Sequence, residues 1–125
     1  MFARSREESE VNTRGRGQTS HMLLGEGDFG SRNLCVTWVD CEPGSQQGLH
    51  AHEHGEQVYV IVSGTGTMLV GDEEREVGPG TMVFIPPRTR HAIRASADAP
   101  LTYVSATSPP FPADRDGSTW TPLET

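Results

Sequence analysis

Three of the chain's five histidines fall within five residues, at His50, His52 and His54. Side chains alternate between the two faces of an extended strand, so His50 and His52 point to the same face, about 6–7 Å apart. Two imidazoles placed in this way can bind one divalent ion, although a metal site needs at least three protein ligands. His91 is the candidate third ligand, because it follows the turn sequence PPRTR and an antiparallel hairpin could bring it opposite His52.

The segments that must position these histidines are short apolar runs of four to eight residues, rich in β-branched and aromatic side chains. Glycine, proline, aspartate or serine stands at each break between them. No window repeats apolar residues at helical spacing over three turns, so long helices are not expected. The pattern predicts an all-β sandwich or barrel. The clearest runs are NLCVTWVD, QVYVIVSG, TGTMLV, TMVFIP, HAIRAS and LTYVSAT.

Length and composition limit the other possibilities. A chain of 125 residues is typical of one domain, and it can bury a core without disulfides. The formal net charge of −7 gives a nucleic-acid-binding role no electrostatic support. No run of 18 apolar residues is present, so no membrane-spanning helix is expected. The charged start MFARSREESE lacks the apolar segment of a signal peptide, which predicts a cytoplasmic protein.

The chain divides into three parts. Residues 1–19 are polar and lack periodicity, which predicts a flexible N-terminal arm that is able to order against a partner subunit. Residues 20–108 contain the strand-like runs and form the predicted barrel. Residues 109–125 are rich in proline, which cannot donate to a β-ladder, so a loop or a draped tail is expected there.

The histidine pair belongs to a longer pattern. From Gly44 the sequence continues with five residues, His50, one residue, His52, four residues, Gln57, six residues and Gly64. This pattern resembles the first motif of the cupin superfamily, G-x5-H-x-H-x3,4-E-x6-G, with glutamine in place of the usual glutamate. The resemblance implies a double-stranded β-helix, or jelly-roll, barrel that extends roughly from the first apolar run to the proline-rich tail.

A second pattern lies downstream. Gly80, Pro86, Arg88 and His91 follow the second cupin motif, G-x5-P-x-G-x2-H-x3-N, except that arginine and alanine replace the turn glycine and the final asparagine. We therefore expect the turn at Arg88 not to need a positive φ. Together the two motifs imply one divalent transition metal, which could be zinc, iron, nickel or manganese. Its expected ligands are His50, His52, Gln57 and His91.

The fourth ligand is a choice between Glu56 and Gln57. If Glu56 points inward, the buried face of the following strand is aliphatic, with three valines on it. If Gln57 points inward, as the resemblance favours, Tyr59 shares its face and the valines form an apolar outer stripe. An exposed stripe of this kind needs a partner, and a homodimer is then expected. The valines are Val58, Val60 and Val62.

The neutral side chain of Gln57 leaves the full +2 charge on a divalent ion, which makes the ion a stronger Lewis acid. We therefore expect a metal-dependent enzyme of isomerase, cyclase or lyase type, acting on a small oxygenated metabolite. Tyr59, His54 and Glu56 are the candidate catalytic residues, because each could transfer a proton. An Fe(II)-dependent dioxygenase is the first alternative, since the same ligands hold iron. A cupin that binds a small ligand without turnover is the second.

Overall fold

β-Strands dominate residues 1–13 and 17–110, which are the residues that the computed structural model describes. Two single-turn 3-10 helices, η1 (Arg6–Glu8) and η2 (Asp28–Gly30), accompany them. Within this described part, no helix has the length and apolarity that crossing a membrane requires. The strands are β1 (Glu10–Thr13), β2 (Gln18–Leu24), β3 (Cys35–Cys41), β4 (Glu56–Ser63), β5 (Gly66–Val70), β6 (Glu73–Val77), β7 (Met82–Ile85), β8 (His91–Ala95) and β9 (Leu101–Ser108).

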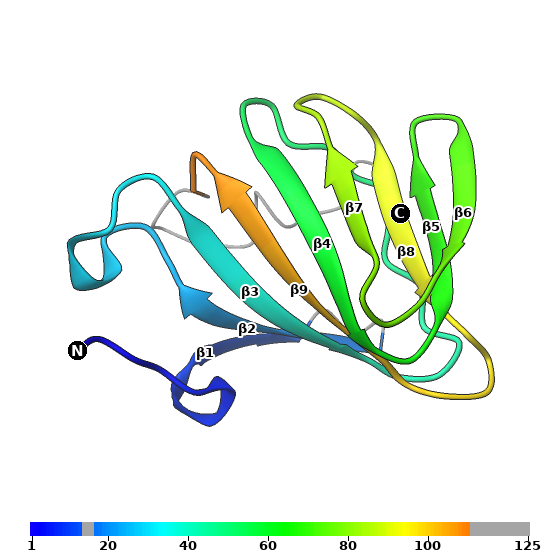
Figure 1. Ribbon diagram of the computed structural model, residues 1–125, viewed down its shortest axis with the longest axis horizontal. Coiled ribbons are helices and arrows are strands. Elements are labelled where there is room, and N and C mark those ends of the chain that lie inside the picture. The colour runs from blue at the N-terminus through cyan, green and yellow to red at the C-terminus, as the bar shows by residue number, and fades with distance from the viewer. Residues whose placement is uncertain (14–16, 111–125) are drawn as a thin grey trace.

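The strands form two antiparallel sheets, a long one in the order β1-β2-β3-β9-β4-β7 and a short one in the order β6-β5-β8. Figure 1 shows the long sheet running across the molecule, with β8, β5 and β6 on the right of the view. The core lies between the sheets, where Ile61 and Leu101 of the long sheet join Met68 and Ile93 of the short one. Strand β3 alternates between buried and half-buried residues along its whole length. This period-two burial confirms the predicted all-β fold.

A glycine fixes the turn between β4 and β5. Gly64 has a φ of 80°, and a Cβ atom at this position would overlap the carbonyl oxygen of Pro100. Only glycine combines this backbone conformation with so close an approach. The turn therefore explains why the first motif ends on Gly64, and it directs the chain from the long sheet into the short one.

The turn between β7 and β8 differs from the expectation. Arg88 has a φ of 58°, so the prediction that its replacement of glycine removes the need for a positive φ is wrong. The conformation lets the Arg88 amide donate a 2.8 Å hydrogen bond to the carbonyl oxygen of His52. The left-handed conformation costs roughly 1–2 kcal/mol for a residue with a Cβ. A backbone hydrogen bond therefore connects this turn to the segment that carries His52.

The N-terminal segment is more regular than the sequence suggested. Strand β1 pairs with β2 at the edge of the long sheet, and η1 precedes it. Arg6 contacts Asp40 on β3 at 3.0 Å, and its guanidinium group lies over the ring of Trp38. These contacts join part of the N-terminal arm to β3 of the same chain. Most of the predicted tail, from residue 111 onward, lies outside the described residues.

The outer face of the long sheet is apolar at β4 and β7. Val60 and Val62 are exposed on β4, as are Met82 and Phe84 on β7. Val60 lies opposite Met82 in the register, and the half-buried Val58 lies opposite Phe84. The valine stripe that was expected with Gln57 pointing inward is therefore present, and it extends onto the neighbouring strand.

Candidate metal centre

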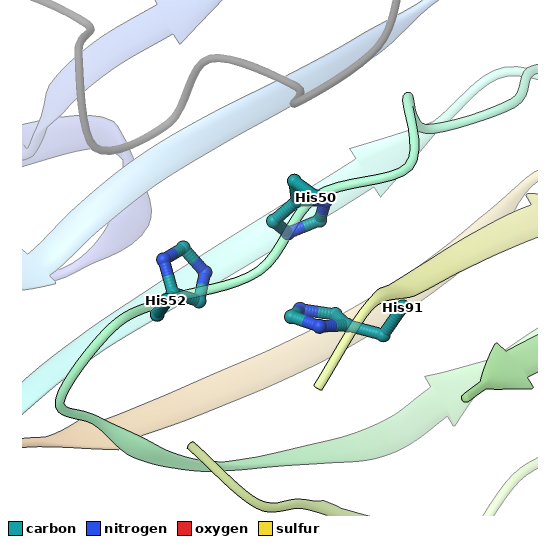
Figure 2. Close-up of side chains that lie close together, drawn as sticks. All are labelled: His50, His52 and His91. Atoms are coloured by element: carbon teal, nitrogen blue, oxygen red, sulfur yellow. The ribbon is translucent and has the colours of Figure 1, made fainter. Parts of the chain in front are cut away.

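Three histidines from two segments meet inside the fold. His50 and His52 lie in the chain between β3 and β4, and His91 is the first residue of β8. One ring nitrogen from each lies within 4.8 Å of the others, and Figure 2 shows the three rings turned toward a common point. The backbones of His50 and His91 pair through two hydrogen bonds of 3.1 and 2.8 Å. His91 therefore lies opposite His50, and not opposite His52 as the hairpin argument expected.

Backbone carbonyls orient two of the rings. His50 Nδ1 lies 2.8 Å from the carbonyl oxygen of Gly48, and His91 Nδ1 lies 2.9 Å from that of Thr89. A carbonyl oxygen can only accept, so Nδ1 carries the proton in both rings and donates it. In the neutral rings, Nε2 is then the nitrogen with the acceptor lone pair. Hydrogen bonds of this kind commonly hold metal-binding histidines in the required tautomer.

Burial favours the neutral form of His91. Its side chain is fully buried, and burial lowers its pKa below the usual 6.5, although the hydrogen bond to Thr89 opposes this shift. The Nε2 atom of His91 is buried and has no hydrogen-bond partner. A buried lone pair without a partner fits a metal ion, which is what the motif implies at this place.

The structure places Gln57 on the buried side of β4. Gln57 is 4% exposed, whereas Glu56 is exposed on the opposite face. The Nε2 group of Gln57 donates a 2.8 Å hydrogen bond to Ser105 Oγ on β9. Its Oε1 atom is buried and has no partner, so it is a free acceptor on the inner face. The geometry favours Gln57 over Glu56, and its role as the fourth ligand stays a prediction.

Tyr59 belongs to a buried polar network beside the histidines. Its ring meets that of His91 edge-on, with centroids 5.8 Å apart, and stacks on Tyr103 at 4.4 Å. Tyr59 donates its hydroxyl proton to Gln47 Oε1, and Gln47 Nε2 donates to the Tyr103 oxygen, both at 3.2 Å. Burial raises the pKa of Tyr59 to about 12 and that of Tyr103 well above 10. Both phenols therefore stay protonated at neutral pH.

The other two candidate catalytic residues lie at the surface. His54 and Glu56 are exposed, and neither belongs to the cluster formed by the three histidines. Glu56 points away from the inner face because its neighbour Gln57 points toward it. Their catalytic roles stay predictions.

Sequence reasoning missed three polar residues that contact or adjoin Gln57 or Tyr59. Ser105 and Thr107 are buried on β9, and they follow Tyr103 at intervals of two, so the period of the strand could have revealed them. Gln47 lies in the irregular segment before His50, where no periodicity indicates which way a side chain points.

Comparison with known proteins identifies the family. A family model described as "Cupin domain" matches residues 37–107, which is more than half of the chain. The uncharacterized protein MJ1618 of Methanocaldococcus jannaschii is 37% identical over 68 residues, which make up 54% of each chain. This chain therefore spans about half the length of that relative.

Solved structures share the fold. KdgF from Halomonas sp. matches with a TM-score of 0.76 at 20% identity, covering 91% of this chain and 96% of that one. The polyketide cyclase RemF from Streptomyces resistomycificus matches with a TM-score of 0.72 at 21% identity, covering 98% and 94%. These likenesses support the fold alone, and with the family model they confirm the predicted double-stranded β-helix. The chain belongs to the cupin family.

Proposed function

We propose that this cupin is a metal-dependent enzyme that acts on a small oxygenated metabolite by non-redox chemistry of isomerase, cyclase or lyase type. The observation that carries the proposal is the cluster of three imidazoles, together with the buried and unpaired carboxamide oxygen of Gln57, the residue that the motif implies as the fourth ligand. Within the described part of the chain, that histidine cluster contains no carboxylate. A divalent ion bound there would keep its +2 charge and would polarise a substrate carbonyl group strongly.

The burial of the ligands sets the direction of approach. His50 and His91 are buried, and their Nδ1 hydrogen bonds hold both rings in one orientation. His52 is only half-buried, so the substrate is expected to approach the centre from its side. On the buried side, the ring of Tyr59 lies edge-on to that of His91. A buried aromatic ring there would keep water away from that side and strengthen electrostatic interactions within the site.

The proposed roles in proton transfer follow from the surroundings of each candidate. Tyr59 keeps its proton and donates it in a hydrogen bond to Gln47, so it stays neutral and does not act as a base. Glu56 faces away from the buried side of β4. We therefore assign the exchange of protons with solvent to His54, which is exposed two residues after His52. The shared fold with a polyketide cyclase supports ring closure as one candidate reaction.

Reconstitution with single metals tests the proposal. Protein stripped with a chelator would be loaded separately with zinc, nickel, manganese or, without air, Fe(II), and assayed against small carbonyl and hydroxycarbonyl compounds with an oxygen electrode. We expect turnover with a redox-inert ion and no uptake of oxygen. Turnover that needs iron and consumes oxygen would replace the proposal with the dioxygenase alternative. Tight binding of a compound that is never converted would instead indicate a ligand-binding cupin.

A further inference from the structure

One end of the inner face of the long sheet is polar. Leu101 and Tyr103 on β9 belong to the apolar core, whereas Ser105 and Thr107 bring buried hydroxyl groups to the end that adjoins Gln57. Thr107 lies opposite Gln57 in the register of β4 and β9. The side chains of such a pair have Cβ atoms about 4.5–5.5 Å apart. Thr107 and Gln57 are therefore direct neighbours on the buried face.

The Thr107 hydroxyl has no partner. Thr107 is 1% exposed, and its Oγ1 atom is buried without a hydrogen bond. Burying a hydroxyl in this way is unfavourable unless something else satisfies it. Its methyl group lies against Gly55, where an added Cβ would come within 2.9 Å of Cγ2. The methyl group therefore fills the side toward Gly55, and the hydroxyl occupies a different staggered position.

The proposed metal ligands do not explain this hydroxyl. Three imidazoles and the Gln57 oxygen already provide four donors, and the neighbouring Gln57 Nε2 group is bonded to Ser105. The Thr107 group is neutral and can donate one hydrogen bond. A hydroxyl donor beside the Gln57 oxygen can donate to a second oxygen atom of a molecule whose first oxygen is already bound at the metal centre.

We propose that Thr107 donates a hydrogen bond to a substrate oxygen next to the one at the metal centre, so that the site selects compounds with oxygens on adjacent carbons, such as α-hydroxycarbonyl compounds. This inference rests on the proposed function, because it requires an ion at the histidines. The neighbouring groups on this face, Ser105 and Thr37, are neutral hydroxyls. Neutral donors favour uncharged compounds or monoanions over substrates with several negative charges.

Cobalt-substituted protein tests the assignment, because the visible spectrum of Co(II) reports both metal uptake and ligand binding. The probe is acetohydroxamate, which offers two adjacent oxygens, and azide is the reference ligand that occupies one position. Thr107→Val keeps the shape of the side chain and removes the hydroxyl. We expect it to weaken acetohydroxamate binding about 5- to 20-fold, the effect of one lost hydrogen bond. Cobalt and azide affinities should not change.

Two further variants serve as controls. Thr107→Ser should restore the affinity for acetohydroxamate, and Thr107→Ala replaces the valine variant if that variant does not fold. Thr102 lies on the same strand but on the outer side, where its hydroxyl donates a hydrogen bond to Asp40. The variant Thr102→Val should therefore leave acetohydroxamate binding unchanged. If Thr107→Val binds acetohydroxamate as tightly as the wild-type protein does, the assignment of Thr107 is overturned. Loss of cobalt from Thr107→Val would overturn it too. Neither result would overturn the metal-dependent function. Failure of the wild-type protein to take up cobalt would overturn the metal-dependent function itself.

Discussion

Gln57 donates a hydrogen bond from Nε2 to Ser105 Oγ at 2.8 Å, and this contact leaves the carboxamide oxygen of Gln57 buried and unpaired. A carboxamide that is held by its nitrogen can offer only its oxygen to another partner. The serine thus orients the residue that stands where the family usually has glutamate.

The first prediction separates Gln57 from Glu56. Gln57→Ala should lower the affinity for zinc by at least about tenfold, since even the residues that orient metal ligands have effects of this size. Glu56→Ala is the matched control on the same strand, and it should keep the metal because its side chain is exposed on the other face. Competition with a chromogenic chelator measures both affinities. Loss of zinc from Glu56→Ala, with zinc kept by Gln57→Ala, would show that Glu56 points inward and that the three valines form the buried face of β4.

The second prediction concerns charge. Gln57→Glu would bring a carboxylate beside the three imidazoles and would reduce the net charge of a divalent centre from +2 to +1. We expect tighter zinc binding, because the carboxylate attracts the ion, together with slower turnover, because the ion becomes a weaker Lewis acid. Titration with zinc and steady-state kinetics on the same preparation compare the two effects. A variant that binds zinc more tightly and turns over faster would contradict the argument for a neutral ligand.

The parts of the site that the sequence predicted depend on regular alternation. Gln57 faces inward and Glu56 outward because the side chains of β4 alternate. His50 and His52, two residues apart in the segment before β4, both contribute to the histidine cluster, as predicted. Alternation alone left two choices on β4, Glu56 or Gln57 inward, and the resemblance to the cupin motif selected Gln57 and with it the outward valine stripe. Alternation along one strand is a local property, so it can be read from the sequence without knowing the fold.

The parts that the sequence did not predict depend on how distant segments meet. His91 pairs with His50 because the segment before β4 runs alongside β8, and no local pattern encodes that register. The positive φ of Arg88 is coupled to a hydrogen bond with His52, 36 positions earlier in the chain. Gln47 bridges two tyrosines from an irregular segment. Each of these relations is tertiary, and the residue types alone do not specify it.

The third prediction concerns the two tyrosines, Tyr59 and Tyr103, which are the only ones in the chain. Burial raises both pKa values, that of Tyr59 to about 12. A group whose pKa is raised by folding stabilises the fold below its unfolded value, here 10, and this contribution is lost as the pH rises toward the folded value. Folded protein should therefore form little tyrosinate up to about pH 11, and its free energy of unfolding should fall above pH 10.

Ultraviolet absorbance of tyrosinate measures this directly. The same protein in urea is the control, and it should titrate near the ordinary value of about 10. Tyr103→Phe leaves a single phenol, so the remaining signal reports Tyr59. A midpoint near 10 in the folded protein would mean that water reaches these phenols, and it would contradict the burial of the two tyrosines beside the histidines.

The last prediction concerns the apolar outer face of β4 and β7, which we propose is covered by a second copy of the chain. Val60, Val62, Met82 and Phe84 are 38–56% exposed there and lie on adjacent strands. Fully burying one such side chain is worth roughly 1.5–3 kcal/mol, so four partly exposed ones provide several kcal/mol for association. Each copy carries a net charge of −7, and the two copies repel one another at low ionic strength.

Sedimentation at tens of micromolar should therefore show a homodimer that becomes tighter as salt is added. Phe84→Glu places a charge at the interface and should give a monomer with unchanged zinc affinity, because Phe84 points away from the histidines. Val11→Glu makes a similar change at an exposed residue of β1, the edge strand at the opposite end of the sheet, and should remain a dimer. A monomeric wild-type protein would refute the proposed dimer. Its apolar face would then need some other partner, since the inward position of Gln57 rests on burial in the single chain.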